Sequence, residues 1–217
     1  MISGFLIKTT LVDYPGKIAS SYFISGCNLR CPYCYNGELI NQTTKDTKEM
    51  VAFESVYEHL EKRKNVLKGF VISGGEPLLH PELPEIIRKV KKLGYLVKLD
   101  TNGCQSEALK KLFQESDTRP DFLAIDIKTS PDKYHLLGID SIFALNQLQE
   151  SIKIISTLPS NQREYRTVLV PPLVSEKEIP IMAKLLPDDA SWMFAQFRND
   201  NCLDSTYNQI KPHTDKK

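Results

Sequence analysis

Short runs rich in β-branched and aromatic residues alternate along this chain with longer segments that carry apolar residues at helical spacing. The runs expected as strands span residues 19–25, 70–73, 96–99, 122–127, 165–170 and 191–197. The segments expected as helices span residues 51–64, 81–93, 107–115, 142–157 and 176–186. Strands that alternate with helices in this way predict a parallel sheet with helices outside it.

These make about six strand-then-helix units, the last of which has a strand without an expected helix, and a full (β/α)8 barrel contains eight. The sequence therefore predicts an α/β protein built as a partial (β/α)6 TIM-like barrel, with a doubly wound open sheet as the alternative. Both architectures place ligand chemistry at the carboxyl ends of the strands. We expect one domain over residues 1–207, in which residues 1–18 form an N-terminal extension of the barrel, and a polar tail over residues 208–217.

The charge and hydropathy of the chain exclude several classes of partner. Lys and Arg number 28 and Asp and Glu number 27, so the formal net charge is +1 and does not point to nucleic acid. The apolar stretches are too short to span a bilayer, and the first residues lack the charged and apolar regions of a signal peptide. We therefore expect a cytoplasmic protein with no nucleic-acid or membrane partner.

Three of the five cysteines lie within eight residues, as Cys27, Cys31 and Cys34, in a Cys-x3-Cys-x2-Cys pattern. An odd, clustered set is unlike the paired cysteines of a secreted disulfide framework. Three thiolates can bind three irons of a cubane cluster and leave the fourth iron open for chemistry. The alternatives are zinc, which usually takes four ligands in a structural site, and thiols that bind no metal.

Other residues suited to chemistry follow the remaining predicted strands, where the carboxyl ends of parallel strands meet at one edge of the sheet. These are Gly74, Gly75 and Glu76 after the second strand, Asp100 and Asn102 after the third, Asp126 and Lys128 at the end of the fourth, and Arg198 after the last.

The cysteine motif has an aromatic residue, Tyr33, just before its last cysteine and is followed after the next strand by Gly-Gly-Glu-Pro at residues 74–77. This combination resembles the radical S-adenosylmethionine (SAM) superfamily, and the resemblance extends over most of the chain. Segments 13–18, 26–36, 100–103, 126–128 and 201–204 are similar to activating enzymes of glycyl-radical proteins, particularly the activators of anaerobic ribonucleotide reductase.

The resemblance implies the cofactors and the reaction. Cys27, Cys31 and Cys34 would ligate a [4Fe–4S] cluster whose fourth iron chelates SAM. Reductive cleavage of SAM would give a 5′-deoxyadenosyl radical that abstracts a hydrogen atom, so the chain would be an anaerobic oxidoreductase. Its partners would be a glycyl-radical protein such as anaerobic ribonucleotide reductase and a one-electron donor of the flavodoxin or ferredoxin type.

Each candidate SAM contact also has a structural interpretation. Gly74 and Gly75 let the backbone approach a ligand and Glu76 offers an acceptor near the SAM ammonium, but a tight strand-to-helix turn needs the same residues. Tyr33 would lie against adenine or pack on the core. Asp126 and Lys128 would approach the ribose and carboxylate of SAM, or form a solvated strand end.

Asp100 and Asn102 are candidate SAM contacts that also suit an Asx-type turn, and Arg198 corresponds to a SAM contact on the terminal strand. Tyr35 departs from the related activators, which often have His directly after the third cysteine, so only its backbone is expected to contact SAM. Cys104 and Cys202 are interpreted as ordinary buried or turn thiols. A radical SAM enzyme that acts on a metabolite, or a non-catalytic metal-holding interaction module, remain alternatives.

Overall fold

The computed structural model describes residues 2–41 and 50–214. These fall into two compact units. Unit 1 comprises the described residues of Met1–Cys27, Glu38–Thr101 and Glu107–Ala124, and unit 2 comprises Asn28–Gly37, Asn102–Ser106 and the described part of Ile125–Lys217. We describe each unit by itself.

Unit 1 is built on five strands in the order β3-β1-β2-β4-β5. Their bounds are Ser3–Thr10 for β1, Ala19–Ile24 for β2, Val51–Ala52 for β3, Gly69–Gly74 for β4 and Leu96–Thr101 for β5. Strands β2, β4 and β5 are parallel, and β2 pairs with β4 from Ala19 opposite Gly69 to Ile24 opposite Gly74. Strand β1 runs antiparallel to both of its neighbours.

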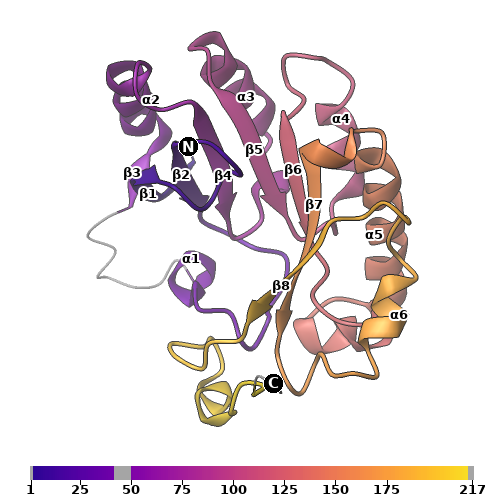
Figure 1. Ribbon diagram of the computed structural model, residues 1–217. Coiled ribbons are helices and arrows are strands. Elements are labelled where there is room, and N and C mark those ends of the chain that lie inside the picture. The colour runs from indigo at the N-terminus through magenta and orange to yellow at the C-terminus, as the bar shows by residue number, and fades with distance from the viewer. Residues whose placement is uncertain (1, 42–49, 215–217) are drawn as a thin grey trace. The chain divides into compact units, whose positions relative to one another are not determined.

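The helices of unit 1 bury one apolar face each. They are α1 (Gly37–Asn41, which begins at the end of a unit 2 segment), α2 (Phe53–Arg63), the 3-10 helix Pro77–Leu79, α3 (Leu83–Lys92) and α4 (Ser106–Leu112). Helix α3 packs against β5 (Figure 1) and buries four apolar side chains at helical spacing, which are Leu83, Ile86, Ile87 and Val90.

Strand β6 (Phe122–Asp126) begins in unit 1 and ends in unit 2. Unit 2 continues with α5 (Ser141–Ile155), β7 (Arg163–Leu169), α6 (Ile179–Ala183) and β8 (Trp192–Gln196), and with 3-10 helices at Pro131–Leu137, Ser160–Gln162 and Ser205–Gln209. Strands β7 and β8 are parallel, and the Asp140 carboxylate caps α5 by accepting a hydrogen bond from the Phe143 N–H at 2.8 Å.

The α/β class and the parallel strands are confirmed, and three differences have physical causes. Within the expected N-terminal extension, residues 3–10 form a strand that was not predicted, because they pair with both β2 and β3. The helix expected from residue 51 begins at Phe53, since Val51 and Ala52 are part of that ladder. The helix expected over 176–186 shrinks to α6, because Pro180 is tolerated only in a first helical turn.

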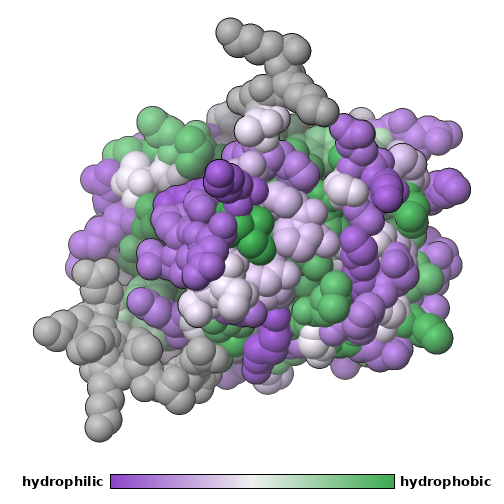
Figure 2. Space-filling model, turned by 90° about the horizontal axis from the view of Figure 1, so that it is seen from below, coloured by the Kyte–Doolittle hydropathy of each residue, from purple (hydrophilic) through white to green (hydrophobic). Residues whose placement is uncertain are grey.

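The surface of the protein is mixed in character. Hydrophobic residues lie among hydrophilic ones on the face shown in Figure 2, as is normal for a folded domain. Among the described helices, none has the length and apolar character needed to cross a bilayer. The division into one domain and a polar tail stays a prediction.

Candidate functional site

The five cysteines are reduced thiols. Cys27 is the last residue of its segment in unit 1, whereas Cys31 and Cys34 lie in unit 2, on the segment Asn28–Gly37 that we call the cysteine loop. Cys31 is buried and the other two are half-buried. Within the described residues, no three His, Cys, Asp or Glu side chains are grouped closely enough to hold a metal ion. The ligand set therefore stays a prediction.

The backbone of the cysteine loop is fixed by hydrogen bonds within unit 2. The Arg30 N–H donates to the Leu137 carbonyl at 2.7 Å, and the Cys34 N–H donates to the Cys31 carbonyl at 3.0 Å. Leu137 ends a 3-10 helix that is followed by Gly138 in the left-handed region, with φ of 79°. The segment between Cys27 and Cys31 is therefore hydrogen-bonded to a turn that lies more than a hundred residues later in the sequence.

The C-terminal segment holds the other end of the same loop. The Leu203 N–H donates to the Cys34 carbonyl and the Asp204 N–H donates to the Pro32 carbonyl, both at 2.9 Å. The segment is itself fixed, because the Cys202 N–H donates to the Asn208 Oδ1 at 2.9 Å. Residues 201–204, one of the segments that carry the resemblance described above, therefore help to hold the cysteine loop in place.

Gly74, the last residue of β4, and Gly75 directly after it both lie against backbone at the end of β2. Gly74 has a φ of 116°, a conformation that favours glycine. A Cβ on Gly75 would overlap the carbonyl oxygen of Gly26, and the neighbouring Glu76 N–H donates to that oxygen at 2.8 Å. The sequence predicts that a ligand closely approaches the backbone at Gly75. In unit 1 the space beside Gly75 is occupied by Gly26, the residue before Cys27.

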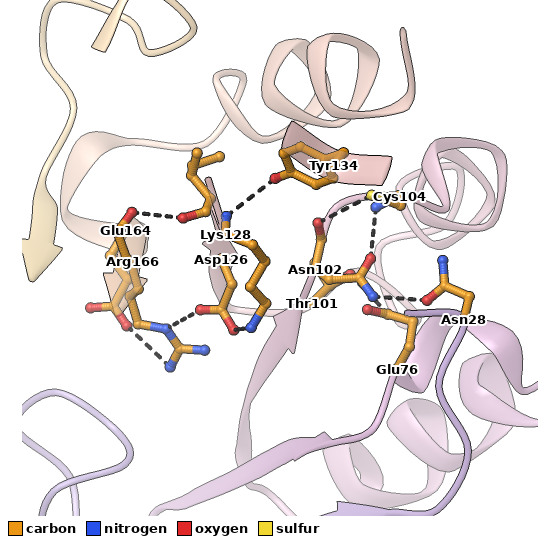
Figure 3. Close-up of polar contacts among 12 residues, drawn as sticks. Asn28, Glu76, Thr101, Asn102, Cys104, Asp126, Lys128, Tyr134, Glu164 and Arg166 are labelled. Carbon is orange, nitrogen blue, oxygen red and sulfur yellow. Dashed lines mark hydrogen bonds and ion pairs between the residues drawn. The ribbon is translucent and has the colours of Figure 1, made fainter. Parts of the chain in front are cut away.

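Glu76 is fully buried and has two hydrogen-bond donors on one oxygen. Its Oε1 accepts from the Leu78 N–H at 3.0 Å, which caps the 3-10 helix. The same oxygen accepts from the hydroxyl of Thr101 at 2.8 Å, and both residues are labelled in Figure 3. The predicted strand-to-helix turn is therefore confirmed. These contacts fix the carboxylate in place, and its contact with SAM stays a prediction.

Asp100 lies inside β5 and not in the turn expected for it. Its carboxylate forms an ion pair with Lys98 at 2.7 Å, and both side chains are buried. Residues two apart in a strand point to the same face, which explains the pairing. Lys98 was not identified from the sequence, although a charged pair at this spacing inside an apolar strand is a usable signal.

Asn102 forms the expected Asx-type turn. Its Oδ1 accepts a hydrogen bond from the Cys104 N–H at 2.9 Å, and its Nδ2 donates to the Oδ1 of Asn28 in the cysteine loop at 2.8 Å (Figure 3). The sequence analysis did not identify Asn28. The available signal was a polar residue directly after the first cysteine of the motif.

Asp126 at the end of β6 lies between two cations (Figure 3). Lys128 contacts one carboxylate oxygen at 2.9 Å, and Arg166 on β7 contacts the other at 2.8 Å. Burial opposes ionisation of Asp126, but Arg166 and Lys128 outweigh it and hold the pKa of the carboxyl well below its usual range. Arg166, which lies 40 residues from Asp126 in the chain, was not predicted from the sequence.

The aromatic residues of the cysteine loop differ in exposure. Tyr33 is 3% exposed, and its hydroxyl has no hydrogen-bond partner among the described residues. Burial raises the pKa of this hydroxyl well above its usual value, and the nearby Cys31 adds to the effect. Tyr35 is 39% exposed. The structure does not assign either ring to a ligand.

The remaining candidates are peripheral to these contacts. Arg198 lies beyond the end of β8 and forms an exposed ion pair with Asp200 at 2.8 Å. Cys104 and Cys202 are buried, and their thiols lie 3.7 and 3.8 Å from the carbonyls of Asn102 and Arg198. These surroundings agree with the interpretation of both as buried or turn thiols.

Comparison with known proteins places these observations in a family context. The sequence matches the Radical SAM superfamily over residues 21–186. It is 30% identical to a Methanocaldococcus jannaschii protein that bears the name glycyl-radical enzyme activating enzyme, over 97% of this chain and 85% of the relative. It is 33% identical to the pyruvate formate-lyase-activating enzyme of Staphylococcus aureus, over 58% of this chain and 52% of that enzyme.

Two solved structures share the fold at low sequence identity. SuiB of Streptococcus suis bound to SAM aligns with a TM-score of 0.56 at 15% identity, over 87% of this chain and 41% of SuiB. Archaeal TYW1 aligns with a TM-score of 0.52 at 18% identity, over 77% of this chain and 60% of TYW1. Together with the family match, this likeness confirms the predicted fold class, the partial-barrel core of the radical SAM type.

The contact between Gly75 and Gly26 leads to a prediction about stability. Replacement Gly75→Ala should lower the free energy of unfolding by about 1–3 kcal/mol, because the new Cβ forces apart two backbone segments. Urea unfolding of the metal-free, reduced protein measures the loss.

Gly37→Ala is the matched control, since its Cβ would meet the flexible end of the Leu203 side chain at 3.3 Å and the Leu203 Cα at an ordinary contact distance of 3.9 Å. We expect this variant to stay within about 0.5 kcal/mol of the parent protein. Equal stability of the two variants would contradict the packing argument.

Proposed function

Because the chain belongs to the radical SAM superfamily, we propose that it is an activase that generates a glycyl radical on anaerobic ribonucleotide reductase. The nearly full-length similarity to the archaeal glycyl-radical enzyme activating enzyme is the observation that carries this proposal. Members of the superfamily use a [4Fe–4S] cluster and SAM, which are the cofactors of this chain. The electron donor would be a flavodoxin or ferredoxin.

The donor set of the chain fits these cofactors. Cysteine thiolates are the usual ligands of iron–sulfur clusters, and Cys27, Cys31 and Cys34 are reduced thiols on or next to one loop. The same loop carries the buried hydroxyl of Tyr33, which has no partner among the described residues and is available to a bound group. When bound, the cluster and SAM would supply one-electron cleavage of the sulfonium and with it the means to abstract a hydrogen atom.

The charged group at the end of β6 would bind and orient SAM. Lys128 suits the carboxylate of SAM, because a charge-assisted hydrogen bond to an ammonium is among the stronger polar contacts. Asp126, kept ionised by Lys128 and Arg166, can only accept hydrogen bonds and suits the ribose hydroxyls. Arg166 would then act through Asp126 as a positioning residue.

The remaining candidates have lesser parts in the proposal. Glu76, held by Leu78 and Thr101, would accept a hydrogen bond from the SAM ammonium. The backbone of Gly74, Gly75 and Tyr35 would line the same ligand. Tyr33, Asp100, Asn102 and Arg198 complete the proposed SAM contacts.

The cluster ligands can be tested by anaerobic reconstitution with iron and sulfide. We expect the parent protein to develop a broad absorption band at about 400 nm, and Cys27→Ala, Cys31→Ala and Cys34→Ala each to lose it. Cys104→Ala is the control and should keep the band. A protein that holds one tightly bound zinc and no iron would exclude the cluster.

The substrate can be tested by electron paramagnetic resonance. We expect a glycyl-radical signal on the anaerobic ribonucleotide reductase of the same organism after incubation with the reconstituted activase, SAM and a reductant. The Cys31→Ala variant should give no signal. Formation of 5′-deoxyadenosine without a radical on the reductase would exclude the activase and favour a metabolite substrate.

The role of Lys128 can be tested by calorimetric titration of the reconstituted protein with SAM. Lys128→Met should weaken SAM binding about 10- to 100-fold, because it removes the cation that faces the SAM carboxylate. Lys153→Met is the control, since Lys153 is an exposed residue paired with Glu150 on α5. If both variants bind SAM as the parent does, the SAM carboxylate is bound elsewhere.

A further inference from the structure

The side-chain amide of Asn28, the residue directly after Cys27, carries a buried hydrogen-bond donor. Its Nδ2 is inaccessible to solvent and has no hydrogen-bond partner among the described residues. A buried donor left unsatisfied costs about 1–3 kcal/mol, so such a group calls for an explanation. A bound group that accepts the hydrogen bond would supply one.

The orientation of this amide follows from a chain of three residues in unit 2 (Figure 3). A backbone N–H only donates, so the Asn102 atom that lies 2.9 Å from the Cys104 nitrogen is Oδ1. The other Asn102 atom is then Nδ2, a donor, and the Asn28 atom 2.8 Å from it must be the acceptor Oδ1. Consequently the Nδ2 of Asn28 is directed away from Asn102.

Asn102 and Cys104, which orient the Asn28 amide, are themselves held in place. Asn102 and Cys104 are 4% and 0% exposed. The carbonyl of Gly103 between them accepts a hydrogen bond from the Ser151 hydroxyl of α5 at 2.8 Å. These hydrogen bonds therefore connect helix α5, through the turn after β5, to the cysteine loop. They fix the Asn28 amide before any ligand binds.

We propose that the Asn28 Nδ2–H donates a hydrogen bond to a sulfur of the iron–sulfur cluster, and that Asn102 is the positioning residue that orients it. The inference rests on the proposed cysteine ligands. Asn28 is bonded directly to Cys27 and shares its loop with Cys31 and Cys34. Hydrogen bonds to cluster sulfurs stabilise the reduced, more negative state and so raise the reduction potential.

The test is a redox titration of the reconstituted protein, in which the spectrum of the reduced cluster measures how much of the cluster is reduced at each potential. Asn28→Ala should lower the ratio of reduced to oxidised cluster at a fixed potential about tenfold, or about 59 mV for one electron. Asn102→Ala keeps the Asn28 amide but removes its orientation, and should shift the ratio in the same direction by less. Asn36→Ala, an exposed residue of the same loop, should leave it unchanged.

Iron content and SAM affinity, measured on the same samples, separate the outcomes. If the parent protein binds no iron, the proposed function fails and the inference fails with it. If the cluster forms and the ratio for Asn28→Ala and Asn102→Ala stays within twofold of the parent, only this inference is overturned. Weaker SAM binding with an unchanged ratio also overturns it, since the amide would then contact SAM. If Asn28→Ala does not keep a cluster, Asn102→Ala decides.

Discussion

The cysteine loop has no regular secondary structure, so its backbone polar groups must find partners elsewhere in the fold. They find them in the turn at Leu137 and in the segment around Leu203 and Asp204. The shape of a loop near the beginning of the chain therefore depends on residues that lie more than a hundred positions later in the sequence. Of the proposed cluster ligands, Cys31 and Cys34 therefore lie on a loop whose shape depends on other parts of unit 2.

The carboxylates of the candidate site are also held by specific contacts within the fold. Carboxylates removed from water are costly unless they are paired, and the buried Asp100 and Glu76 and the half-buried Asp126 each have a defined partner. Asp100 is paired with Lys98 on the same strand, Asp126 is paired with Lys128 and Arg166, and Glu76 accepts two hydrogen bonds. In the proposed function these carboxylates are also among the groups that would contact SAM. Their pairing before ligand binding reduces the reorganisation that binding would need.

The sequence allowed the parallel strands to be predicted, because period and turn residues are local signals. It also allowed the turn at Glu76 and the Asx turn at Asn102 to be predicted for the same reason. What it did not allow are pairings made over long distances in the chain. Strand β1 is defined by its partners, Arg166 meets Asp126 across 40 residues, and Asn28 meets Asn102 across 74. No local pattern specifies these contacts.

Two of the most recognisable motif positions are occupied by residues that the fold itself requires. Gly75 has no room for a Cβ beside Gly26, and Asn102 links the Cys104 backbone to Asn28. Loss of activity after replacing either residue would therefore not identify a cofactor contact. At such positions a functional role is established only by a measurement on the cofactor, such as its reduction potential or its affinity, together with a measured stability of the variant.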